Sequence, residues 1–236
     1  MKILGIDGSG LVASVAVVED DNLIGEYTTG YKKTHSQTLL PMLDELGKMI
    51  ELDLNTIDAI AVAAGPGSFT GLRIASATAK GLGLALGCPI VSVPTVDALA
   101  FNLWGQSGVI CPIMDARRGQ VYTGLYSFDQ DGQFNTLHSQ CAVDFHVIAE
   151  KINELQMPVT FIGDGVPVFK EEIPNLIKVP FRFAPAHLNR QHAASVATLG
   201  QIYYQNGECE PAADHRPDYL RLSQAERERM EKEGKA

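Results

Sequence analysis

The chain has 236 residues, of which 45% are apolar and 20% charged, so it can bury a sizeable core in two small domains or in two similar lobes. Its net charge of −9 disfavours direct gripping of nucleic acid, because phosphate neutralisation by basic groups supplies most of that affinity. No apolar run approaches the roughly 20 residues of a membrane helix. Asp7 interrupts the place where a secretory signal would be apolar, so we expect a cytoplasmic protein.

Neither the cysteines nor the histidines are spaced as metal ligands. The four cysteines contain no C-x-x-C pair, which excludes a zinc ribbon and a thioredoxin-type site and indicates incidental or buried thiols in a reducing compartment. The two histidines nearest in sequence, His187 and His192, straddle a helix start predicted near Asn189. We therefore predict no metal site.

The first part of the chain alternates strand and helix patterns. The pattern predicts three short strands, of which the first ends in Asp7. A helix follows, and the capping-box form of residues Thr34–Gln37 predicts its start. An all-apolar strand, as in a parallel sheet covered on both faces, then leads through a glycine turn into a second helix. The predicted elements are strands 2–7, 12–19, 23–29, 58–64 and 90–93, and helices 35–50, 72–86 and 95–104.

The second half repeats this order in diluted form. The predicted elements are strands 109–115, 120–128 and 159–163 and a helix over 143–155. The stretch that ends at Asp115 aligns in sequence with the stretch that ends at Asp7, at an offset of 115 − 7 = 108 residues. This alignment predicts an internal duplication of a β-β-β-α-β-α unit. We expect an α/β fold of two lobes, residues 1–105 and 106–223, followed by a polar tail over 224–236.

The segment from Gly65 to Arg73 is the one place where residue type and spacing are constrained together. A strand, a tight turn and a helix start leave unpaired amide groups at the positive end of the helix dipole, which is a ready anion site. The segment nevertheless lacks the lysine of a Walker loop, the third glycine of a dinucleotide turn and the flanking glycine of a hydrolase elbow. A turn that only lets the helix pack closely on the sheet explains it at least equally well.

The turn Asp7-Gly8-Ser9-Gly10 is a second candidate anion site. An acid at a strand end beside glycines can hold a magnesium-bound phosphate in actin-like ATPases, but Asp and Gly also favour ordinary hairpins, and spacing alone favours the hairpin. The candidate nucleotide or anion residues of both turns and of the second half are Asp7, Gly8, Ser9, Gly67, Ser68 and Asp115.

The two apolar helices of the first lobe are a third signal. Burial against the protein's own sheet accounts for one face of each helix, whereas a second apolar face would indicate a partner. Leu84 and Leu86 project well apart from Leu72 and Ala79 on a helical wheel, so part of helix 72–86 lies off the sheet-facing stripe.

Several segments together resemble one protein family. They are the Ile-Leu-Gly-Ile-Asp of 3–7, the His-Ser-Gln-Thr-Leu-Leu-Pro-Met-Leu of 35–43, the Gly-Pro-Gly-Ser-Phe-Thr-Gly-Leu-Arg of 65–73, the Met-Asp-Ala-Arg-Arg-Gly-Gln-Val-Tyr of 114–122 and the Pro-Asp-Tyr-Leu-Arg of 217–221. Over essentially its whole length the chain resembles the TsaB family, accessory proteins of bacterial threonylcarbamoyladenosine tRNA modification. The resemblance implies the actin-like fold of acetate and sugar kinases, heat-shock proteins and actin.

The resemblance also implies a non-catalytic role beside the catalytic paralogue TsaD and the ATPase TsaE. In that pathway the threonylcarbamoyl group moves from its adenylate to the adenine next to the anticodon, in tRNAs reading codons that begin with A. Docking onto TsaD, and a homodimer of the isolated chain, would use the first-lobe helices, with tRNA and any ATP or ADP bound only in the complex. The implied docking residues are His35, Leu39, Leu43, Leu46, Gly71, Ala75, Ala79, Leu82 and Leu86.

Two departures from the catalytic paralogues weigh against catalysis by this chain. Where they have a His-His-Met-Glu-Gly-His type run that binds iron or zinc, this chain has Pro94-Thr95-Val96-Asp97-Ala98-Leu99-Ala100, which supplies no imidazole. Their triple-glycine phosphate segment is reduced here to Gly163-Asp164-Gly165. Two other hypotheses stay open: an actin-like ATPase or small-molecule kinase that uses Asp7 and Asp115, and a peptidase that uses Ser68 against a partner.

Overall fold

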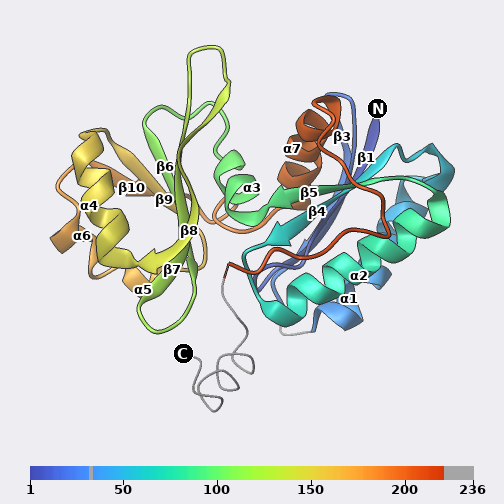
Figure 1. Ribbon diagram of the computed structural model, residues 1–236, viewed down its shortest axis with the longest axis horizontal. Coiled ribbons are helices and arrows are strands. Elements are labelled where there is room, and N and C mark those ends of the chain that lie inside the picture. Colours follow the sequence, from blue (N-terminus) through green and yellow to red (C-terminus); the bar gives the residue numbers. More distant parts are fainter. Residues whose placement is uncertain (32–33, 221–236) are drawn as a thin grey trace.

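The computed structural model describes residues 1–31 and 34–220, which form two five-stranded mixed sheets with helices on both faces (Figure 1). The first sheet contains β1 (Lys2–Asp7), β2 (Ala13–Glu19), β3 (Asn22–Thr29), β4 (Ala59–Gly65) and β5 (Ile90–Pro94). The second contains β6 (Val109–Asp115), β7 (Gln120–Phe128), β8 (Phe134–Asp144), β9 (Val159–Ile162) and β10 (Phe181–Phe183).

The helices connect these strands on either side of the sheets. They are α1 (His35–Met49), α2 (Phe69–Leu86), α3 (Thr95–Phe101), α4 (Phe145–Leu155), α5 (Val166–Phe169), α6 (Ile173–Leu176), α7 (Ala193–Gln205) and the short 3-10 helix η1 (Leu54–Thr56). Within the described residues, none of them combines the length and the hydropathy that crossing a membrane requires.

The two sheets repeat one topology, with strand orders β3-β2-β1-β4-β5 and β8-β7-β6-β9-β10. In each, the central strand pairs antiparallel with the next strand along the chain and parallel with the fourth strand of its half. Asp7 and Asp115, which the sequence offset superimposes, end the two central strands. The predicted duplication and the α/β fold class are therefore confirmed.

Three local predictions differ from the structure. Strand β8 was not predicted, because its residues are mostly polar and half-exposed and show no clear alternation. Thr34 is the N-cap of α1, but its side chain makes no capping bond; only its carbonyl oxygen accepts from the Gln37 amide, at 2.9 Å. The helix expected near Asn189 begins at Ala193.

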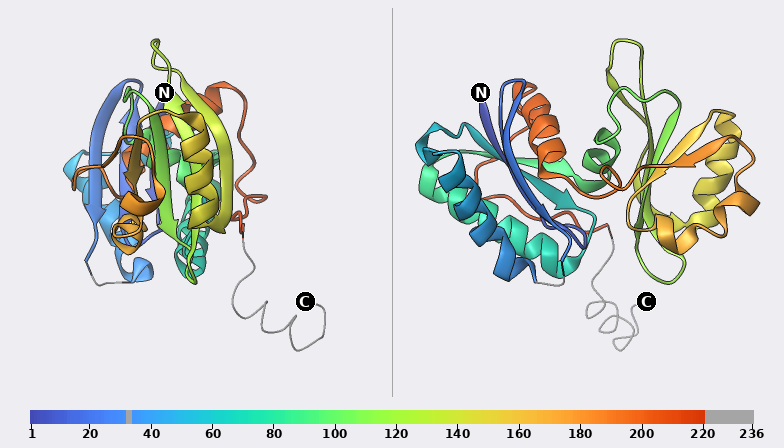
Figure 2. Two further views of the ribbon diagram at one scale, coloured as in Figure 1. Left: turned by 90° about the vertical axis from the view of Figure 1, so that its left-hand side faces the viewer. Right: turned by 180° about the vertical axis from the view of Figure 1, so that it is seen from behind.

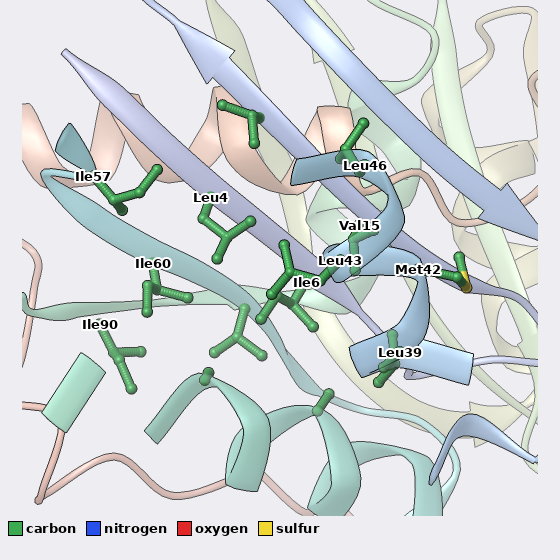
Figure 3. Packing of buried hydrophobic residues seen from close by; sticks show 14 of the residues in the cluster. Leu4, Ile6, Val15, Leu39, Met42, Leu43, Leu46, Ile57, Ile60 and Ile90 are labelled. Atoms are coloured by element: carbon green, nitrogen blue, oxygen red, sulfur yellow. The ribbon is translucent and has the colours of Figure 1, made fainter. Parts of the chain in front are cut away.

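Helices α1 and α2 cover one face of the first sheet (Figures 1 and 2). Figure 3 shows Leu43 of α1 beside Ile6 of β1 and Val15 of β2. Small residues bring α2 close to the sheet, since Ala75 and Ala79 are fully buried there. The residues labelled in this core are Leu4, Ile6, Val15, Leu39, Met42, Leu43, Leu46, Ile57, Ile60 and Ile90.

Helices α3 and α7 lie between the two sheets, and each packs on the sheet of the other half. Leu99 and neighbouring side chains of α3 pack on β6 and β7, while Val196 and Leu199 of α7 pack on β1 and β4. Gly5 permits the approach of α7, because a Cβ there would collide with the Ala193 carbonyl oxygen. The predicted bounds of the second lobe, residues 106–223, stay a prediction, and α7, which falls within them, packs on the first sheet.

Two polar clusters join α3 to the elements around it. The Asn102 amide donates to the carbonyl oxygens of Leu188 and Arg190, at 2.8 and 2.6 Å, and its oxygen accepts from the Ser195 hydroxyl at 2.6 Å. Asp97 accepts from the Tyr126 hydroxyl at 2.6 Å and from the Tyr203 hydroxyl at 3.4 Å. Because the tyrosines come from β7 and α7, Asp97 links the two halves of the chain.

The segment after α7 runs back along α2 and the edge of β5, and we call residues 206–220 the C-terminal strap (Figure 1). Ile90 and Glu210 exchange two backbone hydrogen bonds of 2.9 Å. The Lys80 ammonium donates to the carbonyl oxygens of Ala213 and His215, at 2.8 and 2.9 Å. The strap therefore covers the edge strand and fastens α2; the predicted polar tail, 224–236, lies outside the described residues.

The start of α7 is held by Glu26 of β3. Its carboxylate accepts from the Ala194 amide at 3.1 Å and pairs with His192 Nδ1 at 3.1 Å, while the other ring nitrogen of His192 donates to the His187 carbonyl oxygen at 3.1 Å. The hydrogen bond with Glu26 raises the pKa of His192. Burial raises the pKa of Glu26, but the bonds from His192 and Ala194 outweigh it and leave that pKa lowered.

We predict that His192→Gln lowers the free energy of unfolding by roughly 1–2 kcal/mol near pH 5.5 and by less at alkaline pH. Because the pKa of His192 is raised in the folded protein, its ion pair stabilises the fold fully below the ordinary histidine pKa of 6.5. This stabilisation is lost as the pH rises through the pKa of the folded state. The lowered pKa of Glu26 gives stability that is complete above 4.5. Urea unfolding across this range measures the difference, with exposed His187→Gln as control. Equal loss at all pH values would contradict the ion pair.

Candidate functional site

A cleft of about 300 Å³ lies where the two lobes meet. Its first-lobe wall comes from the turns after β1 and β4, and its second-lobe wall from the end of β6 and the residues that follow β9. The cleft brings together Ser9, Gly67, Ser68 and Asp115 from the predicted anion site. It also contains Arg117, Tyr122 and Asp164, which sequence patterns did not assign to the site.

Asp7 lies behind the cleft wall rather than in it. Its side chain is 1% exposed, and Oδ1 accepts from the Ser9 amide at 2.8 Å and from the Ser9 hydroxyl at 2.6 Å. Burial raises the pKa of Asp7 to about 6, against the opposing effect of these two hydrogen bonds. The carboxyl group therefore organises its own turn and changes charge close to neutral pH.

The second-lobe carboxylates are also engaged by their own chain. Asp115 accepts from the Arg117 amide at 2.8 Å and pairs with the Arg117 guanidinium at 3.2 Å. Asp164 accepts from the Asp115 amide at 3.2 Å, and burial raises its pKa. Across residues 1–31 and 34–220, no three His, Cys, Asp or Glu side chains are grouped so that they could hold a metal ion.

The glycine segment packs directly on the Asp7–Gly10 turn. The Ser68 amide donates to the Ser9 carbonyl oxygen at 2.7 Å, and the Ser68 hydroxyl caps α2 by accepting from the Gly71 amide at 3.4 Å. A Cβ on Gly67 would collide with Ser9, and one on Gly71 with the Gly8 carbonyl oxygen. Close packing therefore explains these glycines, while binding of an anion or nucleotide stays a prediction.

A Ser–His–acid arrangement is present away from the cleft, where sequence patterns did not find it. His215 Nε2 lies 2.9 Å from the Ser76 hydroxyl and Nδ1 lies 2.9 Å from the Glu210 carboxylate, with the Ser92 hydroxyl at 3.0 Å. Ser76 and His215 are 3% and 1% exposed, so the cluster anchors the strap and a peptide cannot reach the hydroxyl. In the described chain no histidine bonds to Ser68.

The predicted docking residues separate into buried and accessible ones. Those buried in the first-lobe core or against the Asp7 turn are Leu39, Leu43, Leu46, Gly71, Ala75 and Ala79. The chain's own sheet and turn cover these side chains, and their part in partner docking stays a prediction. His35, Leu82 and Leu86 are half-buried, and docking through the two helices stays a prediction.

The accessible side of these helices is apolar in part. On α2, Arg73, Ala77, Gly81 and Leu84 follow one another at spacings of four, four and three residues and share one face; we call them the outer stripe. Leu84 is 62% exposed, and a Cβ at Gly81 would meet no atom. Leu40 on the neighbouring α1 is 55% exposed. Of the residues on this accessible face, the helical-wheel pattern had indicated only Leu84.

Duplicated sheets, exchanged helices and a cleft between the lobes define a protein of the actin-like class. A family model of TsaD, the tRNA N6-adenosine threonylcarbamoyltransferase, matches residues 22–229. The TsaB protein of tRNA threonylcarbamoyladenosine biosynthesis from Bacillus subtilis is 36% identical over 232 residues, covering 96% of each chain. Its Escherichia coli counterpart is 30% identical over 70% of this chain and 72% of its own.

A solved structure from Pseudomonas aeruginosa, described as an uncharacterized protein similar to peptidase YeaZ, is 27% identical with a TM-score of 0.78 and covers 93% of this chain and 99% of that one. A second structure, YeaZ from the same organism, has a TM-score of 0.74 at 27% identity and covers 92% and 99%. The chain belongs to the TsaD-type domain family and, within it, to the TsaB proteins of tRNA threonylcarbamoyladenosine biosynthesis.

We predict that Asp7→Asn stabilises the protein at pH 8 by up to roughly 3 kcal/mol, the equivalent of a pKa raised from 3.8 to about 6. The folded state binds the Asp7 proton more tightly, so wild-type stability falls as pH rises from 3.8 through about 6. The Asn oxygen still accepts from Ser9. Chemical unfolding at pH 4 and 8 measures the effect, and exposed Asp131→Asn is the control. A destabilised Asp7→Asn protein would show that the charged form is favoured.

Proposed function

We propose that this chain is a non-catalytic subunit of the complex that forms threonylcarbamoyladenosine in tRNA, and that it activates a catalytic TsaD partner alongside the ATPase TsaE. The observation that carries the proposal is the accessible apolar face of α1 and α2. Leu40 and Leu84 are more than half exposed on adjoining helices that already bury their opposite faces. Exposed leucines beside small residues suit close packing of a partner helix.

The surroundings of residues 95–100 support the non-catalytic role. The residues at 95–100, where catalytic paralogues carry imidazoles, pack on the second sheet, and Asp97 is engaged by two tyrosines. The cleft carboxylates Asp115 and Asp164 accept hydrogen bonds from backbone amides. Chemistry would then take place on TsaD, with this chain fixing its conformation.

The net charge of the chain is a reason to place tRNA binding on the partners. At −9, the chain would repel the phosphate backbone, so a catalytic partner would hold the tRNA. The same accessible face would pair two copies of the isolated chain, and TsaD would replace one copy in the cytoplasm. ATP or ADP would bind only where the complex completes a site.

The docking proposal is tested by a charge placed on the accessible face. Leu84→Glu should weaken binding to TsaD by about 30-fold or more, because a buried unpaired carboxylate costs at least 2 kcal/mol at a well-packed contact. Val168→Glu, a change of the same kind at a 56% exposed site on α5, should leave binding intact. Calorimetric titration gives both affinities. Equal affinities would refute docking through this face.

The activator role is tested by reconstitution. Purified TsaD and TsaE, given threonylcarbamoyl-adenylate and tRNA, should modify tRNA only when this chain is added, and this chain alone should modify none. Mass spectrometry of digested tRNA provides the measurement. Full modification without the chain would end the proposal.

The second candidate is nucleotide binding by the isolated chain, which the grouping of Ser9, Gly67, Ser68 and Asp115 in one cleft favours. Calorimetric titration with ATP and magnesium would then give a saturable signal that Ser68→Ala weakens. A flat titration would dispose of this candidate.

A further inference from the structure

Arg73 stands at the N-terminal end of the outer stripe of α2. It follows the helix start by one turn and is exposed. Leu84 is eleven positions further along, which places the two residues about 16 Å apart along the helix axis. The outer stripe therefore has a cation at one end, a large apolar side chain at the other, and Ala77 and Gly81 between them.

The Arg73 side chain is held in one orientation by aromatic residues. Its guanidinium carbon lies 3.9 Å from the centre of the Phe69 ring, and Nε donates to the Tyr219 hydroxyl at 3.2 Å. The Phe69 and Tyr219 rings are themselves in contact, with centroids 4.9 Å apart. Stacking and the Nε bond restrict the side-chain rotamers, so little entropy remains to be lost on binding.

The C-terminal strap fixes the Tyr219 side of this stack. The amide of Asp218 donates to the Ala64 carbonyl oxygen at 2.7 Å, and its carboxylate accepts from Gln140 of β8 at 3.3 Å. Asp218 also lies so close to Gly65 that a Cβ there would collide with its carbonyl oxygen. The strap thus enters between the two lobes and delivers Tyr219 to the guanidinium.

Within residues 1–31 and 34–220, neither terminal nitrogen of Arg73 has a hydrogen-bond or ion-pair partner. Among the described residues, the ion pairs of the chain involve other cations, and Nε is the only Arg73 nitrogen that donates a hydrogen bond. Arg73 is therefore an exposed, stacked guanidinium whose forked end has no acid partner among the described residues, in a chain of net charge −9.

We propose that Arg73 binds a carboxylate of the protein partner that packs on the outer stripe, which rests on the proposed docking of α1 and α2. The two Nη groups match the two oxygens of an Asp or Glu side chain. The partner would present a helix whose acidic residue lies about 16 Å from the side chain that covers Leu84. A protein carboxylate is favoured over an RNA phosphate for two reasons. Arg73 shares the outer stripe with apolar residues, which suit a protein surface, and the chain as a whole is acidic, which disfavours RNA.

The proposal is tested with three variants and a matched control, each titrated calorimetrically into the TsaD partner at low and high salt. Arg73→Ala should weaken binding about tenfold or more and flatten its salt dependence. Arg73→Lys should recover little, because lysine lacks the planar fork. Tyr219→Phe keeps the ring and loses only the hydroxyl, so a smaller loss is expected. Lys178→Ala, which removes an exposed cation from the second lobe, should bind as wild type.

The outcomes separate this inference from the docking proposal. If Leu84→Glu abolishes binding and Arg73→Ala does not weaken it, the carboxylate contact is refuted and docking stands. If the wild-type chain does not bind, docking itself fails. If Arg73→Ala keeps its affinity for TsaD but lowers the affinity of the assembled complex for tRNA, the ligand is a phosphate and the inference is wrong. Thermal unfolding checks that each variant is folded.

Discussion

Helices α3 and α7 pack between the two sheets, each against strands that the other half of the chain supplies. Each sheet buries much of its inner face under a helix from the other half of the chain, so the two lobes complete one another. The polar contacts of Asn102 and Asp97 lie in the same seam and connect α3 to α7, to β7 and to the linker before α7. The cleft and the accessible face of α1 and α2 both derive their geometry from this exchange, because it sets how the lobes meet and which helices remain outside.

Most of the fold could be predicted because apolar periodicity reports burial directly. The strand ending at Asp7 and the one ending at Asp115 were predicted with their observed bounds, and their offset indicated the duplication. The pattern could not show that α7 returns to the first sheet, because a helix with one apolar face reads the same whichever sheet it covers. The pattern also could not predict strand β8. Its residues are mostly polar, and they form a strand because they pair with β7.

The candidate site was predicted only as a set of residue types. The cleft does unite residues from turns that are far apart in sequence. Spacing could not show which hydrogen bonds the carboxylates make. Asp7 accepts from the Ser9 amide of its own turn, and Asp164 accepts from the Asp115 amide at the end of β6. The same limit applies to the docking helices. Wheel geometry separated Leu84 from the stripe of Leu72 and Ala79, but only the packing shows that Ala75 and Ala79 are fully buried. Burial is a property of the neighbours, which a single helix does not reveal.

The C-terminal strap has a consequence for the order in which the molecule can form. Its bonds to α2 join residues that are more than 130 positions apart, as with Lys80 and Ala213. A ribosome that has just completed the first sheet has therefore not yet made α7, which covers its inner face, or the strap that seals the edge of β5. The aromatic stack on Arg73 needs Tyr219 and forms last. The chain acquires its finished outer face only once residues up to Tyr219 have been synthesised, so a shorter nascent chain offers a partner an unfinished surface.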